Sequence, residues 1–469
     1  MSFRHDFDPT SLREYDIRGI VDRTLSTADA FAIGRCFGTV VARGGGTTTA
    51  IGFDGRLSSP SLSEALSNGL RASGIEVLNI GRGPTPMLYY TATAMNTGGA
   101  VMVTGSHNPP DYNGFKMMLG RKPFFGTQIQ DIGRMARDGD VVAETKAPAR
   151  GVDIAGEYVK RLLVDWDGGD RRLKVVWDNG NGSAGDVLAE LVKGLPGEHI
   201  VLNGTIDGTF PAHHPDPTVP KNLEQLIAKV AETHADIGIA FDGDADRIGL
   251  VDDTGMIMFG DQLMVMLARD VLHAHPGATI IADVKASQVL FDEIARAGGK
   301  PLMWKTGHSL IKSKMAETGS PLAGEMSGHI FFADKWYGFD DALYAAVRTL
   351  GILARSDRRM SEFRKSLPQV INTPEVRFDC DDVRKFKVIE EVAARLRQDG
   401  ASVSETDGVR VLTDDGWWLL RASNTQAVLV ARAEAKTEAG LEALKAALVR
   451  QLAASGLSAP DFSGSHAGH

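Results

Sequence analysis

The chain has 469 residues, 43% of them hydrophobic, and a formal net charge of −9 at pH 7. This length predicts about three domains of roughly 150 residues each, and the negative charge with dispersed basic residues argues against nucleic acid or an anionic membrane as a partner. The two cysteines, Cys36 and Cys380, are too few for a disulfide framework or a zinc site, which favours a reducing cytoplasm. Because the N-terminus has no apolar core and no run of about 18 apolar residues occurs, we expect neither a signal peptide nor a membrane span.

Short apolar segments alternate with longer helical patterns, which predicts an α/β fold with parallel or mixed sheets. One cycle of strand, turn and helix recurs, and it indicates three related modules. Its strands are expected at 49–53, 173–177 and 279–283, each followed by a helix, at 61–73, 184–192 and 287–297. From residue 375 the pattern changes to an α+β module with helices at 382–398 and 437–454 and strands at 408–412, 417–421 and 427–433.

The composition loosens at three places, around residues 145–152, 256–261 and 368–374. Pro and Gly concentrate there, between segments with regular apolar periodicity. We therefore expect four parts, at residues 1–150, 151–255, 256–368 and 369–469.

A loop with the sequence Thr-Gly-Ser-His-Asn-Pro follows the predicted strand 99–103 and carries Ser106 at its third position. Glycine lets the backbone turn tightly, and a following pair of prolines disfavours a helix start, so Ser106 is expected to stand out at the strand end as an exposed hydroxyl. Such an oxygen is suited to be a nucleophile. An ordinary turn that caps the strand is the alternative interpretation.

Three carboxylates occupy alternate positions of a second loop, at Asp242, Asp244 and Asp246, after the apolar run 237–241. They repel one another unless a cation neutralises them, and the small residues between them let them converge. An all-oxygen ligand set favours Mg²⁺ over zinc or copper. An EF-hand is excluded because its required glycine and glutamate are replaced by Arg247 and Asp253. We predict a magnesium site, with a solvated acidic turn as the alternative.

Two further loops carry groups that suit a sugar phosphate. Glu325 and Ser327 are separated by one residue, so in an extended loop both point the same way and offer hydrogen bonds to adjacent sugar hydroxyls. Arg421 opens a run of hydroxyl and amide side chains, a combination that suits phosphate oxygens. Taken alone, the loop with Glu325 is equally typical of a helix-capping glutamate or a core histidine. The loop with Arg421 is equally typical of a hydrogen-bonded turn.

These four loops, with the segment Tyr15-Asp16-Ile17-Arg18-Gly19 near the start, together resemble the α-D-phosphohexomutases and, within them, the bacterial phosphomannomutase/phosphoglucomutase branch. The resemblance covers essentially the whole chain, and its motifs stand in family order. It implies a four-domain architecture around a central cleft: three related α/β domains with mixed sheets and a C-terminal α+β domain similar to the TATA-box-binding protein. It also implies a monomeric, cytoplasmic isomerase of carbohydrate metabolism.

The same resemblance implies that Ser106 is a phosphoserine that donates and recovers a phosphoryl group. It implies Mg²⁺ as cofactor, held by Asp242, Asp244, Asp246 and an oxygen of the phosphorylated Ser106. The metal would neutralise the charge of the phosphate. Arg18 and Arg247 would stabilise charge on the transferring group.

Further positions match by resemblance and divide by role. Lys116 and His329 are implied in proton transfer, and Glu325 and Ser327 in holding the sugar 3- and 4-hydroxyls. The remaining matches are implied in substrate binding: Tyr15, Lys285, His308, and the four residues Arg421, Ser423, Asn424 and Thr425 that would grip the phosphate not being transferred.

The implied reaction is an intramolecular phosphoryl transfer between O6 and O1 of mannose or glucose phosphate, with hexose 1,6-bisphosphate as intermediate and activator. Met326, between Glu325 and Ser327, favours neutral sugars, and a phosphoglucosamine mutase is the alternative within the family. Two other functions stay open from the residues. One is a Mg²⁺-dependent sugar phosphatase with Asp242 as nucleophile and Asp244 as acid, and the other is a non-catalytic sugar-phosphate-binding protein.

Overall fold

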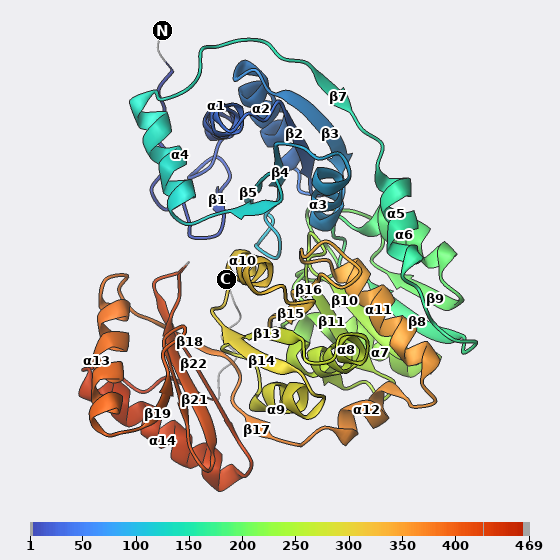
Figure 1. The fold of residues 1–469 in the computed structure, drawn as a ribbon, viewed down its shortest axis with the longest axis vertical. Helices are drawn as coiled ribbons and strands as arrows, with labels where there is room; N and C mark the ends of the chain where they lie inside the picture. Colours follow the sequence, from blue (N-terminus) through green and yellow to red (C-terminus); the bar gives the residue numbers. More distant parts are fainter. Residues whose placement is uncertain (1–2, 425, 463–469) are drawn as a thin grey trace.

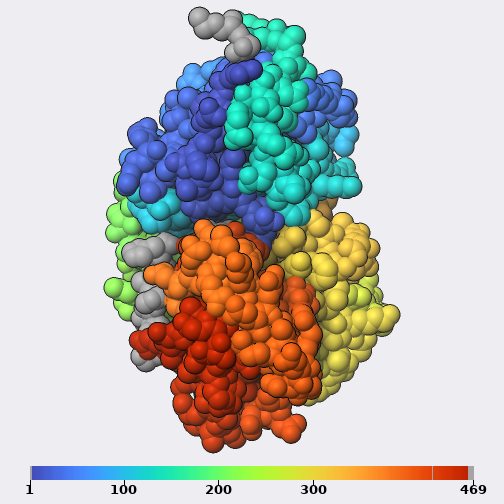
Figure 2. Space-filling model, turned by 90° about the vertical axis from the view of Figure 1, so that its left-hand side faces the viewer, coloured from blue at the N-terminus to red at the C-terminus, as the bar shows by residue number. Residues whose placement is uncertain are grey.

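The computed structural model describes residues 3–424 and 426–462. Four β-sheets, each with its own helices, follow one another along the chain, and we name the corresponding parts modules I to IV. In Figure 1 module I lies at the top, modules II and III together below it, and module IV at the lower left. Figure 2 shows the blue module I stacked on the orange and red module IV, with the yellow module III beside it.

Module I is built on a seven-stranded sheet in the order β1-β5-β4-β2-β3-β7, with β6 beside β5. Its strands are β1 (Ile17–Ile20), β2 (Thr48–Phe53), β3 (Glu76–Arg82), β4 (Gly99–Val103), β5 (Tyr112–Leu119), β6 (Lys122–Phe124) and β7 (Ala149–Gly151). Its helices are α1 (Thr27–Arg43), α2 (Ser59–Ala72), α3 (Thr85–Ala94) and α4 (Thr127–Asp138). The loose segment 145–152 thus contributes β7, which pairs in parallel with β3.

Modules II and III carry smaller sheets, in the orders β12-β11-β10-β8-β9 and β14-β13-β15-β16. Module II contains α5 (Ala155–Val164), β8 (Leu173–Asp178), α6 (Gly185–Gly194), β9 (Gly197–Leu202), the 3₁₀ helix η1 (Pro220–Leu223), α7 (Glu224–Thr233), β10 (Ile237–Phe241), β11 (Ile248–Asp252) and β12 (Ile257–Met258). Module III contains α8 (Gly260–Ala274), β13 (Thr279–Asp283), α9 (Gln288–Arg296), β14 (Lys300–Trp304), α10 (His308–Thr318), β15 (Leu322–Gly324), β16 (Ile330–Phe332), α11 (Ala342–Arg355) and α12 (Met360–Ser366).

Module IV has a different topology, with the order β17-β22-β21-β20-β19 and β18 beside β22. All of its strand pairs are antiparallel. Its elements are β17 (Ile371–Asn372), β18 (Val376–Asp379), α13 (Arg384–Gln398), β19 (Ser402–Ser404), β20 (Val409–Leu412), β21 (Gly416–Ala422), β22 (Val428–Ala435) and α14 (Glu438–Ala454). The predicted change to an α+β pattern near residue 375 is confirmed.

The first three modules share one strand arrangement, which confirms the repeat expected from the sequence. In each, a first strand (β2, β8 or β13) pairs in parallel with the next strand on one side and with a third strand on the other. That third strand then turns back into an antiparallel fourth strand. The loop with Ser106, the loop with the three aspartates and the loop with Glu325 are the turns between the third and fourth strands of the three modules.

The hydrophobic core explains how these turns are held together. The largest cluster of buried apolar side chains runs without interruption through modules I, II and III, from Tyr89 and Trp177 to Phe332. Module IV has a core of its own, and a small cluster of Val284, Trp417 and Leu419 joins it to module III. The three related modules therefore pack as one body. No helix in the described part of the chain combines the length and apolar character that crossing a membrane requires.

Two glycines allow α1 and α2 to pack in close contact. A Cβ on Gly34 would lie 2.3 Å from the carbonyl oxygen of Leu66, and one on Gly69 would lie 2.2 Å from that of Phe31. Both distances are far below van der Waals contact, and both neighbours are backbone atoms that cannot move alone. The close packing of these helices therefore requires glycine at both positions.

We predict that Gly34→Ala lowers the free energy of unfolding by about 1–3 kcal/mol, because the added methyl forces the two helices apart. The matched control is Gly156→Ala in α5, where nothing lies within 4 Å of the point that a Cβ would occupy; alanine there should raise stability by up to about 1 kcal/mol. Denaturant unfolding of both variants measures the difference. Equal stability of Gly34→Ala and the parent would contradict the close helix packing.

Candidate active site

Ser106 lies in the turn between β4 and β5, and it is buried rather than exposed, with 2% of its surface accessible. Its φ of +49° is in the left-handed region, and its amide donates to Thr104 Oγ1 at 2.9 Å. The expectation of an exposed hydroxyl is therefore wrong. The reason is that the aspartate loop of module II covers this turn, so closely that a Cβ on Gly243 would lie 2.4 Å from the Ser106 carbonyl oxygen. Ser106 Oγ donates to Asp242 Oδ2 at 2.9 Å.

The three aspartates converge in the turn between β10 and β11. Asp242, Asp244 and Asp246 are all fully buried, and one ligand atom from each lies within 4.8 Å of the others. Asp242 Oδ1 accepts the amides of Asp246 at 3.1 Å and Arg247 at 3.2 Å, which curls the loop around its first carboxylate. Ala245 completes the turn with a φ of +57°. The sequence prediction that small spacers let the carboxylates converge agrees with this geometry.

Module I contributes a cation to this acidic loop. Lys116, on β5, is buried, and its Nζ donates to Asp244 Oδ2 at 2.7 Å and also to Asp246. Burial opposes the charge of Lys116, but Asp244 and Asp246 outweigh it and raise its pKa. Burial and the neighbouring Asp246 and Asp244 raise the pKa of Asp242, whereas Lys116 and His329 overcome burial and lower that of Asp246. One lysine thus leaves part of the negative charge uncompensated.

The aspartate group fits a divalent metal ion. Asp244 Oδ1 accepts no hydrogen bond from any residue that the structure describes, and Asp246 Oδ1 has only an ion pair with His329 Nε2 at 3.2 Å. A buried carboxylate oxygen without a donor is costly unless a cation binds it. Hard oxygen ligands suit Mg²⁺. The described residues therefore include an acidic group that can bind a metal.

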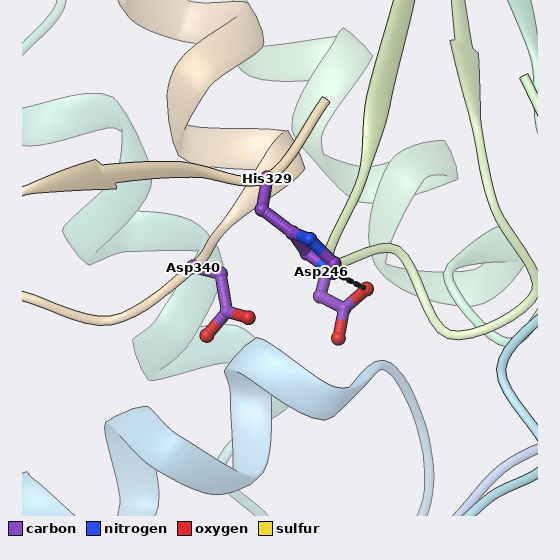
Figure 3. A group of neighbouring side chains, drawn as sticks. All are labelled: Asp246, His329 and Asp340. Carbon is purple, nitrogen blue, oxygen red and sulfur yellow. Dashed lines mark ion pairs between the residues drawn. The ribbon is translucent and has the colours of Figure 1, made fainter. Parts of the chain in front are cut away.

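A second group of potential ligands shares Asp246 and adds His329 and Asp340. In Figure 3 the His329 ring points toward Asp246, with which it forms an ion pair, and Asp340 lies to one side of them. Most of its ligand atoms are already engaged. His329 pairs with Glu325 as well as Asp246, and Asp340 Oδ1 pairs with Lys312 Nζ at 2.9 Å, although Asp340 Oδ2 accepts no hydrogen bond from the described residues. The aspartate loop is the better candidate because it brings three carboxylates together and offers two carboxylate oxygens that lack a hydrogen bond.

The loop with Glu325 and Ser327 is a tight turn between β15 and β16, not the extended loop expected from the sequence. The amide of Gly328 donates to the carbonyl of Glu325 at 3.0 Å, because β15 and β16 form an antiparallel hairpin that requires a short reversal. Glu325 Oε1 accepts the Gly307 amide at 2.7 Å, and its Oε2 lies 2.8 Å from His329 Nδ1. Ser327 Oγ lies 3.3 Å from the same His329 nitrogen.

His329 links the turn with Glu325 and Ser327 to the aspartate loop. Its backbone bridges to that of Arg247, whose Nε lies 3.3 Å from His329 Nε2. Burial lowers the pKa of His329, but Asp246 and Glu325 more than compensate and raise it to about 9. The imidazole is therefore protonated near neutral pH. A protonated imidazole held between two carboxylates, with the Ser327 hydroxyl 3.3 Å from its Nδ1, is an arrangement suited to proton transfer.

Arg18 approaches the serine loop from the N-terminal segment. Its guanidinium donates to the side chains of Asn108 and Asp16, and its Nε has no partner among the residues that the structure describes. Ser106, Lys116, Arg247, His329 and the three aspartates form one connected network, with Arg18 at its edge. Several modules contribute to it.

A second set of predicted residues gathers around module IV. Arg421 Nε donates to Asp407 Oδ2 at 3.0 Å, and the same oxygen accepts the Thr306 amide at 3.1 Å. Tyr15 OH donates to the Thr306 carbonyl at 2.9 Å and accepts from Asn424 Nδ2 at 2.8 Å. These contacts connect modules I, III and IV around one tyrosine.

The remaining predicted residues lie between these two sets or beyond them. Lys285 Nζ pairs with Glu375 Oε2 at 2.9 Å, and the ring of His308 lies 5.6 Å from that of His329, centroid to centroid. The amide of Ser423 donates to the Val428 carbonyl at 3.0 Å. Thr425, also predicted to bind phosphate, lies outside the described residues.

Sequence reasoning missed the residues that hold these loops in place. Thr85, the first residue of α3, donates its amide to the Asp244 carbonyl at 2.9 Å and its hydroxyl to Asp244 Oδ2 at 2.5 Å. Asp407 orients Arg421, and Asp54 and Arg56 support the serine loop. Of these residues, only Asp54 and Arg56 could have been found from the sequence, because they directly follow the first strand of the repeat in module I. The fold and site together define a multidomain α/β protein in which a buried hydroxyl faces an acidic loop that can bind a metal, an arrangement suited to phosphoryl transfer.

Comparison with known families agrees with this class. Models of the phosphoglucomutase/phosphomannomutase family match four consecutive segments: alpha/beta/alpha domain I at residues 9–139, domain II at 157–255, domain III at 259–371 and the C-terminal domain at 375–451. Together they cover most of the chain, and the chain belongs to this family. The resemblance inferred from the sequence motifs is confirmed.

Individual relatives extend over nearly the full length. The chain is 46% identical over 440 residues to a phosphomannomutase/phosphoglucomutase of Pseudomonas putida, covering 94% of this chain and 95% of the relative. It is 47% identical over 436 residues to a phosphoglucomutase of Neisseria meningitidis, covering 92% and 94%. A solved family protein of Burkholderia thailandensis superposes with a TM-score of 0.91 at 43% identity, covering 97% and 99%.

We predict that Mg²⁺ raises the unfolding temperature of the metal-depleted protein and that Asp244→Asn abolishes this effect. Binding to the folded state alone stabilises by about 2.7 kcal/mol at a free ligand concentration about 100 times its Kd. Thermal unfolding with increasing Mg²⁺ after chelation measures it.

The matched variant for this test is Asp340→Asn, which removes a charge from the second group only and should retain the Mg²⁺ effect. The opposite pattern, with Asp340→Asn insensitive and Asp244→Asn responsive to Mg²⁺, would assign the metal to the second group.

Proposed function

We propose that the protein catalyses reversible intramolecular phosphoryl transfer between O6 and O1 of mannose and glucose phosphates, with Ser106 as the phosphate carrier. The observation that carries this proposal is the buried contact of Ser106 Oγ with Asp242 Oδ2 at 2.9 Å, across the boundary of two modules. This contact holds the serine oxygen against the carboxylates of the candidate metal site. The names of the relatives, phosphomannomutase/phosphoglucomutase and phosphoglucomutase, support the same activity.

Asp242, Asp244 and Asp246 would hold Mg²⁺, with an oxygen of the phosphorylated Ser106 as a further ligand. When bound, the ion supplies positive charge beside a phosphoryl group that carries nearly two negative charges. The chain itself supplies the neighbouring cations. Lys116 pairs with Asp244 and Asp246, and Arg247 directly follows the aspartate loop, so both are placed to stabilise charge that develops on the transferring group.

Proton transfer is assigned to Lys116 and His329. His329 is held by Glu325 on one ring nitrogen and Asp246 on the other, so its ring orientation is fixed before substrate arrives. It gives a proton to, or takes one from, the sugar oxygen that exchanges the phosphoryl group. Arg18 would stabilise charge on the transferring group; it donates to Asn108 of the serine loop, and its buried Nε has no partner among the described residues.

The sugar and the phosphate that is not transferred would bind toward module IV. Glu325 would accept hydrogen bonds from the 3- and 4-hydroxyls of the sugar, and Ser327 would donate to them or accept from them. Neither residue needs to contact the 2-hydroxyl, at which glucose and mannose differ. The phosphate that is not transferred would be bound by charge-assisted hydrogen bonds. The residues assigned to substrate binding are Tyr15, Lys285, His308, Arg421, Ser423, Asn424 and Thr425.

A hexose 1,6-bisphosphate would act as intermediate and activator, because it presents either phosphate to Ser106 after turning within the site. We further propose a monomer that works in the cytoplasm without a nucleic-acid or membrane partner, in keeping with the dispersed basic residues. The domain boundaries proposed are those after residues 150, 255 and 368.

Replacing Ser106 with alanine tests the proposed function. Ser106→Ala should lower kcat for glucose 1-phosphate and mannose 1-phosphate by roughly 10⁴-fold or more, since it removes the phosphate carrier. A coupled assay with Mg²⁺ and a trace of glucose 1,6-bisphosphate measures this, beside glucosamine 1-phosphate as the amino-sugar substrate.

The control is Ser63→Ala, which removes another buried hydroxyl of module I, one without a hydrogen-bond partner among the described residues. It should remain fully active. Unchanged activity of Ser106→Ala, or release of free phosphate instead of an isomerised sugar phosphate, would contradict the mutase mechanism. Turnover of glucosamine 1-phosphate alone would reassign the substrate.

Arg421→Lys should raise KM about 10- to 100-fold with a smaller effect on kcat, because lysine retains the charge but loses the planar, paired hydrogen bonds to phosphate. Steady-state kinetics with glucose 1-phosphate separates the two parameters. Arg397→Lys is the control on the same module, since Arg397 forms only an exposed ion pair with Glu405. An unchanged KM for Arg421→Lys would remove Arg421 from the proposed phosphate site.

A further inference from the structure

Arg56 lies under the serine loop with a fully buried side chain. Its guanidinium donates to four backbone carbonyls of the segment that contains Ser106. These are Ser106 at 2.8 Å, Asn108 at 2.7 Å, Pro109 at 2.5 Å and Tyr112 at 3.0 Å. A single side chain therefore donates to four carbonyls of this segment, of which that of Pro109 also accepts the Tyr112 amide at 3.0 Å.

Asp54 fixes both the arginine and the first part of the loop. Its Oδ2 accepts from Arg56 Nε at 3.1 Å, from the Gly105 amide at 3.1 Å and from Thr104 Oγ1 at 2.8 Å. Gly105 is required at this point, because a Cβ there would lie 2.4 Å from the guanidinium carbon. The loop and the arginine are thus fitted to one another by shape as well as by hydrogen bonds.

The same position of the repeat supports the functional turn in module III. Asp283, at the end of β13, accepts the Met326 amide at 3.0 Å and so holds the turn between β15 and β16. Asp54 directly follows β2, the equivalent strand of module I. Module I alone has an arginine two residues further on, where module III has Lys285 and module II has Gly180. Among the three modules, arginine at this position is therefore particular to the one that carries Ser106.

Module II packs against the same arginine. The ring of Phe210 covers the guanidinium, with the guanidinium carbon 5.1 Å from the ring centroid. A Cβ on Gly208 would lie 2.4 Å from the Arg56 Cα, and one on Gly55 would lie 2.4 Å from a side-chain carbon of Ile206. Arg56 thus lies where the module of Ser106 meets the module of Asp242.

We propose that Arg56 is a positioning residue for phosphoryl transfer: it holds Ser106 in its left-handed conformation and in register with the aspartate loop. This inference rests on the proposed role of Ser106 as phosphate carrier. Arg56 acts through the loop backbone and contacts neither the Ser106 hydroxyl nor the aspartates. Its loss should therefore slow the transfer without weakening the binding of the substrate, whose proposed contacts are Tyr15 and residues of modules III and IV, none of which Arg56 touches.

The test compares Arg56→Lys with Arg35→Lys. Arg35 is a buried arginine of the same module that donates to the carbonyls of Ala72 and Val142, on the far side of α1 from the serine loop. Lysine keeps the charge in both variants but replaces a planar fork of five N–H donors with three donors on one nitrogen, so it cannot reproduce the same set of hydrogen bonds. The measurements are thermal unfolding, kcat and KM for glucose 1-phosphate, and the single-turnover rate at which glucose 1,6-bisphosphate phosphorylates Ser106, followed by intact mass.

Arg56→Lys should lower kcat and the phosphorylation rate by about 100-fold with KM nearly unchanged, as expected when a reacting atom is displaced by about 1 Å. Arg35→Lys should lose comparable stability and keep both rates. The inference is overturned if Arg56→Lys keeps the parent rates, or if both variants lose rate in proportion to their loss of stability.

A second variant covers the case in which Arg56→Lys does not fold. Phe210→Leu removes the ring from above the guanidinium and keeps an apolar side chain, so it should lower the phosphorylation rate by a smaller factor, again without a change in KM. A parent rate in Phe210→Leu, with Arg56→Lys unfolded, counts against the inference. Failure of the proposed function is seen separately, as activity that survives in Ser106→Ala.

Discussion

The buried pairing of Lys116 with Asp244 and Asp246 is the interaction on which the arrangement of the site depends. The lysine belongs to β5 of module I and the aspartates to the turn after β10 of module II, so neither module can bury its charges alone. Breaking a buried ion pair by removing one partner costs about 3–5 kcal/mol. The two modules are therefore held in one relative position, and that position brings Ser106 Oγ within hydrogen-bonding distance of Asp242.

A single architectural unit explains why such different chemistry converges. Modules I, II and III each turn from a third parallel strand into an antiparallel fourth strand, and each of these turns carries a different set of groups. The shared core brings the turns to one place. The Ile248 amide donates to the Gly328 carbonyl at 3.0 Å and joins the turns of modules II and III, while the Thr85 amide, at the start of α3, ties module I to the turn of module II. Module IV, with its own core, contributes Arg421 and Asn424 from outside this body.

Much of the fold followed from local patterns in the sequence. The strands expected at 49–53, 173–177 and 279–283 are β2, β8 and β13, and the change to an α+β module near residue 375 is also seen. These patterns are local because apolar periodicity and turn residues depend on near neighbours. The carboxylates of Asp242, Asp244 and Asp246 converge as predicted, because they lie within one short loop. By contrast, the burial of Ser106 depends on Gly243 of another module, and no local pattern predicts it.

The sequence by itself determined the family, the order of the four parts and the chemical types in each loop, since motifs and periodicity are properties of neighbouring residues. Tertiary structure alone decided that Ser106 is covered rather than exposed and that Glu325 lies in a tight turn against His329. It also decided that Lys116 neutralises aspartates more than 100 residues away, and that Arg56 lies beneath the serine loop. The physical reason is that buried charges and carbonyls must find partners wherever the fold brings them, and those partners lie far away along the chain.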